Sequence, residues 1–167
     1  VREVLQPGWE QIAPYGGTSV LTDFKGIDDN ETDPLDPPDT NATVGPNHVI
    51  EATNVAFSIY DKSGNRLSLT QFSDFFSPVV TNTFFSDPIV QYDQLADRYI
   101  ILVLDIDFTN ELSYLDFAVS DTNDPTQGFS EMHRIEVGEF SVGLNQPTLG
   151  DYPKLGMNAD AYVVTLN

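Results

Sequence analysis

The sequence predicts an all-β protein, because short runs rich in β-branched and aromatic residues alternate with turn residues over most of its length. The turns include DKSGN at 61–65 and DTNDP at 121–125, which are typical of antiparallel hairpins. Only residues 72–76 suit a single helical turn, and no long segment has the 3.6-residue apolar period of a helix. The expected strands are 48–53, 55–60, 66–69, 89–92, 98–104, 112–120, 133–137 and 162–166.

An internal repeat narrows this fold class. Residues 39–50, 87–100 and 151–163 each contain an acidic residue, a short strand, a polar turn and a longer apolar strand. The spacing is 50 residues from Asn47 to Asp97 and 63 from Asp97 to Asp160, which favours four-stranded propeller blades with loops of variable length over the strand pairs of a sandwich. The sequence therefore predicts a β-propeller of which about two and a half blades are present, whereas closure needs roughly four to eight.

The domain organisation follows from this repeat. Residues 1–38 are expected to form an extended, acidic and proline-rich arm, and residues 39–167 the incomplete set of blades. Because Asn167 falls inside the second strand of a blade, we expect an unpaired sheet edge or completion by another chain. The expected partners are accordingly the remaining propeller blades or another protein chain. Because the first residue is Val1 and not Met, we expect processing.

Composition excludes several classes of function. The 167 residues include 26 Asp and Glu against 7 Lys and Arg, a net charge of −19, which repels nucleic acid and anionic membranes. No apolar run reaches about 18 residues, so membrane insertion is not expected. The absence of Cys excludes disulfides and thiolate metal sites. The acidity indicates either a solvated surface or cation binding.

Several motifs resemble, in this order, the blade signatures of a group of large, mostly uncharacterised secreted microbial proteins that contain a β-propeller domain. The motifs are PPDTN (37–41), VGPNH (44–48), IYDKSGN (59–65), DPIVQYD (87–93) with DRY (97–99), AVSDT (118–122) with DPT (124–126), and DYPKLG (151–156). The likeness spans residues 22–167. It implies a propeller fold and an extracellular, secreted location, but it provides no catalytic residues. Asn30 and Asn41 begin triplets that fit the N-glycosylation pattern.

The repeat also predicts a candidate metal site. Asp39, Asp87 and Asp151 are expected to be equivalent residues that precede the innermost strand of successive blades, near one rim of a central channel. Such a ring of carboxylates either caps backbone N–H groups of the turns or holds a cation, for which Ca²⁺ is the candidate. Capping is the favoured role, because the following turns contain donors that need acceptors.

Two further sets of residues have chemical potential. His48, Tyr152 and Lys154 are weak catalytic candidates, because together they could abstract and return a proton as in a polysaccharide lyase. Asp105 and Asp107 alternate on one face of a strand, with Asp116 expected on the neighbouring strand. Carboxylates so placed either face water or share a cation, since neighbouring like charges raise each other's pKa.

These observations leave two hypotheses. The favoured one is a non-catalytic extracellular β-propeller module for binding or assembly, with Ca²⁺ as a candidate stabilising ion and no other cofactor. The alternative is part of a carbohydrate-active enzyme, a polysaccharide lyase or glycoside hydrolase, whose site lies at the propeller mouth and whose partner is an extracellular glycan. The repeat favours the first hypothesis, because it accounts for nearly every conspicuous residue.

Overall fold

The structure is a computed structural model that describes residues 22–28, 30–32, 35–79, 84–139 and 150–167. These residues form antiparallel β-sheets and two short helical turns, α1 (Phe72–Phe75) and η1 (Pro125–Gln127). The prediction of an all-β protein is therefore confirmed. The described part of the chain contains no helix with the length and apolarity needed to cross a bilayer.

Three antiparallel sheets follow one another along the chain, and in each of them every strand pairs with its neighbour in sequence. The first sheet contains β1 (Asn41–Val44), β2 (His48–Ala52), β3 (Ala56–Asp61) and β4 (Arg66–Gln71). The second contains β5 (Phe84–Asp93), β6 (Arg98–Asp107), β7 (Leu112–Val119) and β8 (Glu131–Glu139). The third is the hairpin of β9 (Lys154–Met157) and β10 (Tyr162–Thr165).

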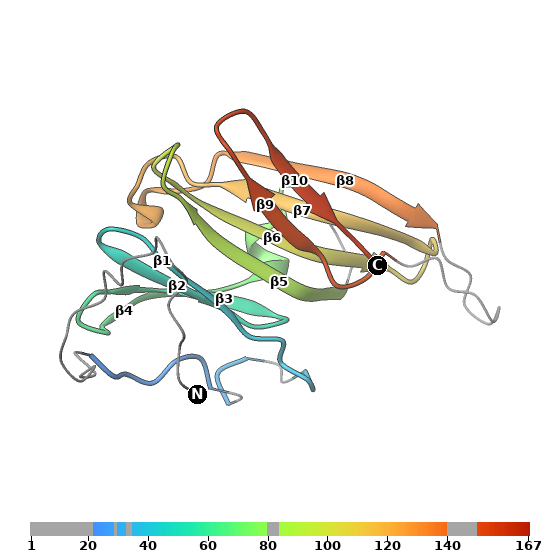
Figure 1. Ribbon diagram of the computed structural model, residues 1–167. Coiled ribbons are helices and arrows are strands. Elements are labelled where there is room, and N and C mark those ends of the chain that lie inside the picture. Colours follow the sequence, from blue (N-terminus) through green and yellow to red (C-terminus); the bar gives the residue numbers. More distant parts are fainter. Residues whose placement is uncertain (1–21, 29, 33–34, 80–83, 140–149) are drawn as a thin grey trace, which may run out of the picture.

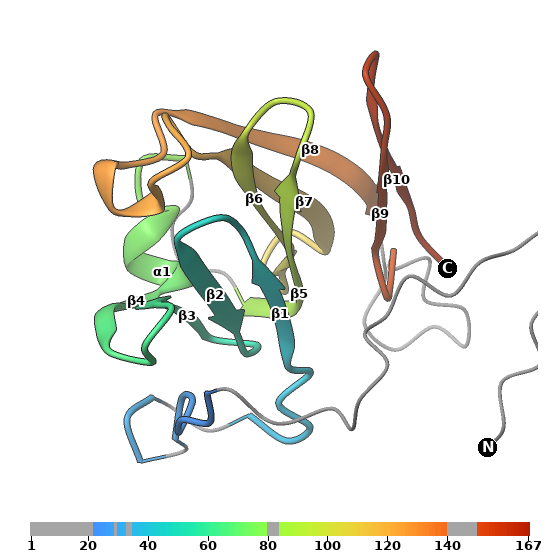
Figure 2. The same cartoon turned by 60° about the vertical axis from the view of Figure 1, so that its left-hand side comes forward.

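The second sheet lies between the other two (Figures 1 and 2). Its first strand β5 runs beside β1 of the first sheet and also contacts β9 of the hairpin. One apolar core joins the first and second sheets and includes Ile50, Phe57 and Ile101. A second core, around Leu102 and Leu104, joins the second sheet to the hairpin. Because side chains alternate along a strand, β6 serves both cores with its two faces.

The three sheets begin with the same backbone geometry. Asp39, Asp87 and Tyr152 all have positive φ angles, of 44°, 50° and 53°. In each sheet the fifth residue after this position pairs with the second strand: Val44 with Val49, Tyr92 with Tyr99, and Met157 with Tyr162. The predicted repeat is therefore present in the structure. It differs by one residue from the sequence alignment, since Tyr152, and not Asp151, occupies the left-handed position of the third unit.

Each of the eight expected strands overlaps an observed one, and the helical turn at 72–76 corresponds to α1, but β5 begins at Phe84, before the expected start at 89. A further difference concerns the end of the strand expected at 98–104. Strand β6 continues to Asp107, because Asp105 remains in register opposite Phe85 and Tyr114 and forms an ion pair with Arg134. A buried carboxylate with a cationic partner does not have to end a strand.

Side chains of the first sheet satisfy the backbone at the edge of the second. The N–H of Val90 donates to Asn41 Oδ1 at 3.1 Å, and the N–H of Tyr92 donates to Thr43 Oγ1 at 2.9 Å. These are N–H groups of β5 that point away from its partner β6. Because an unpaired buried N–H group is costly, the two hydrogen bonds fix β1 and β5 side by side without a continuous ladder between them.

Tyrosine hydroxyl groups form a second type of junction. It occurs once between the first and second sheets and once between the second sheet and the hairpin. Tyr99 of the second sheet donates to the carbonyl oxygen of His48 in the first sheet at 3.0 Å. Tyr162 of the hairpin donates to Asp93 Oδ2 in the second sheet at 2.7 Å. Tyr99 and Tyr162 are equivalent by register, so the second sheet and the hairpin each bond the turn region of the unit before them, the first through a backbone carbonyl oxygen and the second through a carboxylate.

The segment before β1 packs on the outer side of the first sheet. The rings of Phe24 and Tyr60 lie 5.0 Å apart, the N–H of Ile27 donates to Glu51, and Arg66 bonds both carboxylate oxygens of Glu31. The predicted arm covers residues 1–38, and its residues 1–21, 29, 33 and 34 lie outside the described ones. Its described residues contain no helix or strand, and the domain division stays a prediction.

Asn54, in the turn between β2 and β3, joins the beginnings of the first two units. Its side chain is buried, with 2% exposure. Its Nδ2 donates to Asp39 Oδ2 and to the carbonyl oxygen of Pro37, both at 2.8 Å, and its Oδ1 accepts the N–H of Asp87 at 2.7 Å. One carboxamide therefore satisfies three polar groups that would otherwise lack these partners.

We predict that Asn54→Ala lowers the free energy of unfolding by about 2 kcal/mol or more, because it leaves buried donors and acceptors unsatisfied. Urea denaturation measures the change. Asn110→Ala is the matched control, since Asn110 is exposed and bonds only Asp107 within its own turn; its loss should stay within about 0.5 kcal/mol. Equal effects of the two substitutions would contradict the bridging role of Asn54.

Candidate functional site

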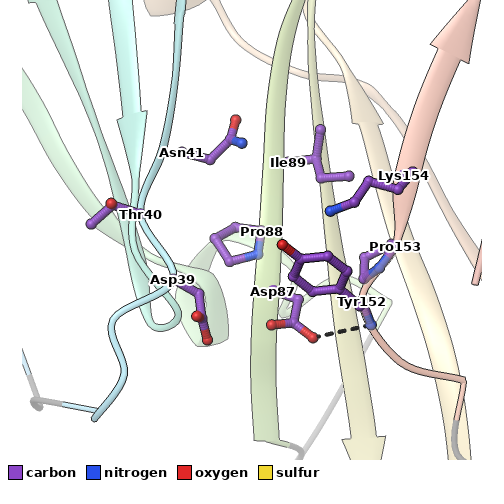
Figure 3. A pocket seen from close by; sticks show the side chains of 9 residues that line it. All are labelled: Asp39, Thr40, Asn41, Asp87, Pro88, Ile89, Tyr152, Pro153 and Lys154. Carbon is purple, nitrogen blue, oxygen red and sulfur yellow. Dashed lines mark hydrogen bonds between the residues drawn. The ribbon is translucent and has the colours of Figure 1, made fainter. Parts of the chain in front are cut away.

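A cavity of about 190 Å³ lies where the three units begin. Figure 3 shows that its walls come from the opening turns and first strands of all three units, with Pro88 and Ile89 between the other two sets of residues. The lining residues are Asp39, Thr40, Asn41, Asp87, Pro88, Ile89, Tyr152, Pro153 and Lys154. The repeat therefore converges on one place, where the opening residues of the three units meet.

The three predicted Asp residues gather around this cavity. Asp39 and Asp87 line it, and Asp151 lies next to Asp87. Burial raises the pKa of Asp87, and the nearby carboxyl of Asp151 and the charge of Asp39 raise it further. Asp87 also accepts the N–H of Tyr152 at 3.3 Å, so one carboxylate caps the opening turn of the following unit.

The two carboxylates that line the cavity accept different hydrogen bonds. Asp87 caps a backbone donor of the next unit, whereas Asp39 accepts a bond from the side chain of Asn54. Among the described residues, no group of three or more His, Asp or Glu side chains has an arrangement that would hold a metal ion. Asp39, Asp87 and Asp151 as metal ligands therefore stay a prediction.

The weak catalytic candidates fall into two places. Tyr152 and Lys154 both line the cavity, and the Lys154 ammonium nitrogen lies 3.3 Å from the centre of the Tyr152 ring. His48 begins β2, beyond the end of β1 that is farther from the cavity. Its Nε2 lies 3.6 Å from Asp124 Oδ1, so its charged partner belongs to the loop after β7. The structure brings together two of the three residues.

Asp105 and Asp116 form a second acidic site inside the second sheet. Both are fully buried, and Asp116 pairs in register with Arg134 on β8. Arg134 lies 2.8 Å from an oxygen of Asp105 and 3.9 Å from one of Asp116, with its guanidinium above the ring of Tyr114. The sequence offered two alternatives, exposure to water or a shared cation. The structure shows the second, and the cation is Arg134.

Asp107 has a separate role. It accepts hydrogen bonds from the side-chain amide of Asn110 and from the N–H groups of Asn110 and Thr109 in the turn that follows β6, and these bonds lower its pKa. By contrast, burial and the proximity of Asp105 raise the pKa of Asp116 to about 8. One Arg cannot compensate two buried carboxylates, so the pair favours a state that retains one proton.

Sequence reasoning missed Asn54 and Arg134. Asn54 has the appearance of an ordinary turn residue, and only the fold brings it to the opening turns of two units. Arg134 had a usable signal, because it is the single basic residue among the alternating positions of β8 that lie opposite the acidic face. Finding it required the register between β7 and β8, which the sequence does not specify.

Comparisons with protein-family models, with curated proteins and with solved structures found no match for this chain.

We predict that Asp116→Asn makes the protein less sensitive to alkaline pH. The pKa of Asp116 is raised above its ordinary value of 3.8 to about 8, so the native state binds a proton more tightly than the unfolded state. The stability linked to that proton is complete below about pH 4 and is lost as the pH rises toward about 8. Urea midpoints at acid, neutral and alkaline pH should therefore fall less for the variant than for the wild type.

Asp107→Asn is the matched control for this experiment. Because the pKa of Asp107 is lowered, its linkage has the opposite sign, and its contribution to stability is present above its ordinary pKa and is lost in acid. The control should retain the alkaline loss of stability seen in the wild type. If Asp116→Asn shows the same alkaline loss as the wild type, Asp116 does not hold the proton.

Proposed function

We propose that this chain is part of an extracellular β-propeller and serves as a non-catalytic module for binding or assembly. The observation that supports the proposal best is the repeated junction. Two consecutive units each begin with a left-handed residue, place a first strand beside that of the neighbouring unit, and reach back to the preceding unit with a tyrosine hydroxyl. Such repetition is expected of blades arranged around a common axis.

The cavity at the opening turns fits this proposal. In a propeller the first strands of all blades surround the axis, and here the first strands of three units line one cavity. Its walls carry carboxylates, an amide and an exposed aromatic ring, which are groups that bind ligands through hydrogen bonds. The extracellular location rests on the resemblance of the blade motifs.

Ca²⁺ is the proposed stabilising ion. Asp87 has a raised pKa because burial and two neighbouring carboxyl groups disfavour its charge, and an oxygen-coordinated divalent cation would remove that repulsion. The net charge of −19 supports cation binding in general. Carboxylate and carbonyl oxygens are the ligands that Ca²⁺ prefers.

We predict that Ca²⁺ raises the melting temperature more than Na⁺ at equal ionic strength, because binding adds to the screening that both salts provide. Asp87→Asn should abolish the excess, and Asn tolerates the positive φ at this position. Asp61→Asn is the control, because Asp61 caps a turn of the first sheet away from the cavity; it should leave the excess unchanged. Identical shifts in the two salts would contradict the ion site.

The alternative function is a carbohydrate-active enzyme with its site at the propeller mouth. It is favoured by one observation, the meeting of Tyr152 and Lys154 with Asp87, a carboxyl of raised pKa, in a single cavity. Tyr and Lys side chains can exchange a proton with a sugar carbon next to a carboxylate. His48 lies beyond the far end of β1, which counts against His48, Tyr152 and Lys154 acting together as catalytic residues.

A lyase assay separates the two functions. We predict that the wild-type protein releases no unsaturated product from acidic polysaccharides, as followed by ultraviolet absorbance, while retention on a polysaccharide column or a Ca²⁺ response remains detectable. Tyr152→Phe removes only the hydroxyl and is the diagnostic variant. If the wild type is active and Tyr152→Phe loses most of that activity, with unchanged thermal stability, the enzyme hypothesis replaces the module.

A further inference from the structure

The side chain of Asn54 uses both of its N–H bonds and its oxygen in contacts near the cavity. Its Nδ2 donates to the carbonyl oxygen of Pro37 and to Asp39 Oδ2, and its Oδ1 accepts the N–H of Asp87. These partners also decide which way the carboxamide points, because two acceptors face its nitrogen and a donor faces its oxygen. Since Asn54 is buried, its side chain is held in this one orientation.

The backbone of Asn54 holds the same turn of the first unit. Its N–H donates to the carbonyl oxygen of Pro38 at 2.9 Å, so Asn54 bonds both residues that precede Asp39 as well as the Asp39 side chain. Among the described residues, Asn54 is the one hydrogen-bond partner of the Asp39 carboxylate. The bonds to Asn54 therefore fix both the left-handed turn that presents Asp39 and the direction of its carboxylate.

The two acidic residues that Asn54 connects belong to different units. Asp39 precedes β1 and Asp87 lies in β5, and both line the cavity, whereas Asn54 does not. Figure 3 shows the two carboxylates at the same end of the cavity, and Asp39 is near enough for its charge to act on Asp87. A cation bound by both carboxylates requires them at a set separation, and the structure shows Asn54 as the residue that joins them.

We propose that Asn54 is a positioning residue of the cation site and sets its affinity by holding Asp39 and Asp87 at the separation that one ion requires. This role rests on the proposed Ca²⁺ site and adds to it a residue that does not touch the ion. Residues that orient metal ligands through hydrogen bonds typically change metal affinity by about 10- to 100-fold when they are replaced. Because Asn54 belongs to the first sheet and Asp87 to the second, the affinity depends on the correct joining of the two sheets.

The first experiment measures Ca²⁺ affinity by calorimetry and the luminescence lifetime of bound Tb³⁺, which the Tyr152 ring in the cavity wall can sensitise. We expect Asn54→Ala to lower the Ca²⁺ affinity by about tenfold or more. Lifetimes in H₂O and D₂O should show additional water on Tb³⁺, because Asp39 no longer reaches the ion. Thr43→Val is the matched control, since it removes the bond to the N–H of Tyr92 at the same junction of sheets; it should leave affinity and hydration unchanged.

The second experiment is a double-mutant cycle with Asp39→Asn, which removes the charge and tolerates the positive φ at this position. In this background Asn54→Ala should weaken Ca²⁺ binding much less than in the wild type, because the carboxylate that Asn54 positions is already lost. A general loss of structure would weaken binding equally in both backgrounds, and equal losses would overturn the proposal. Asn54→Ser, whose hydroxyl can satisfy one of the partners, takes the place of the Ala variant if that variant does not fold.

The wild-type protein provides a test that needs no substitution. Saturation with Ca²⁺ should slow amide hydrogen exchange at Asp87, whose N–H bonds Asn54, more than at Tyr92, whose N–H bonds Thr43. Equal slowing at the two amides would contradict the role of Asn54. A wild-type protein that binds neither Ca²⁺ nor Tb³⁺ would overturn the ion site and this role together, whereas binding that is unchanged in Asn54→Ala overturns the role of Asn54 alone.

Discussion

The edge of the second sheet that faces the first sheet is the constraint on which the rest of the structure depends. The N–H groups of Val90 and Tyr92 point away from β6, and they are satisfied by side chains of β1. Asn54 satisfies the N–H of Asp87 in the same way. A sheet edge without partners is costly when buried and prone to aggregation when exposed. Polar side chains of the preceding unit provide the missing hydrogen-bond acceptors, so the two sheets are joined without a continuous ladder between them.

The candidate site is a consequence of the same arrangement. Because the opening turns are held together, their left-handed residues Asp39, Asp87 and Tyr152 surround one cavity. The crowding of carboxyl groups there raises the pKa of Asp87. The buried pair of Asp105 and Asp116 shows another solution to like charges, since Arg134 forms an ion pair with Asp105 and the pKa of Asp116 is raised so that the pair favours keeping one proton.

Much of the fold could be predicted from the sequence, because strand patterns and turn residues are local signals. The repeat even located β1 and β9, which are short and weakly apolar. What could not be predicted depends on register and on distant contacts: Arg134 opposite Asp116, Asn54 between two turns, and Tyr152 in place of Asp151 at the left-handed position. The alignment of the repeats could predict that Tyr152, Lys154 and Asp87 lie close together. The position of His48 away from these residues depends on the three-dimensional fold, which the alignment does not give.

Amide hydrogen exchange of Val90 and Tyr92 tests most directly whether side chains of one unit hold the edge of the next. These two N–H groups have no strand partner, and their bonds go only to Asn41 and Thr43. We predict exchange as slow as that of β6 amides in the ladder, and a selective loss of protection at Val90 in Asn41→Ala. Exchange at the rate of the exposed turn amide of Lys62 in the wild-type protein would contradict the account.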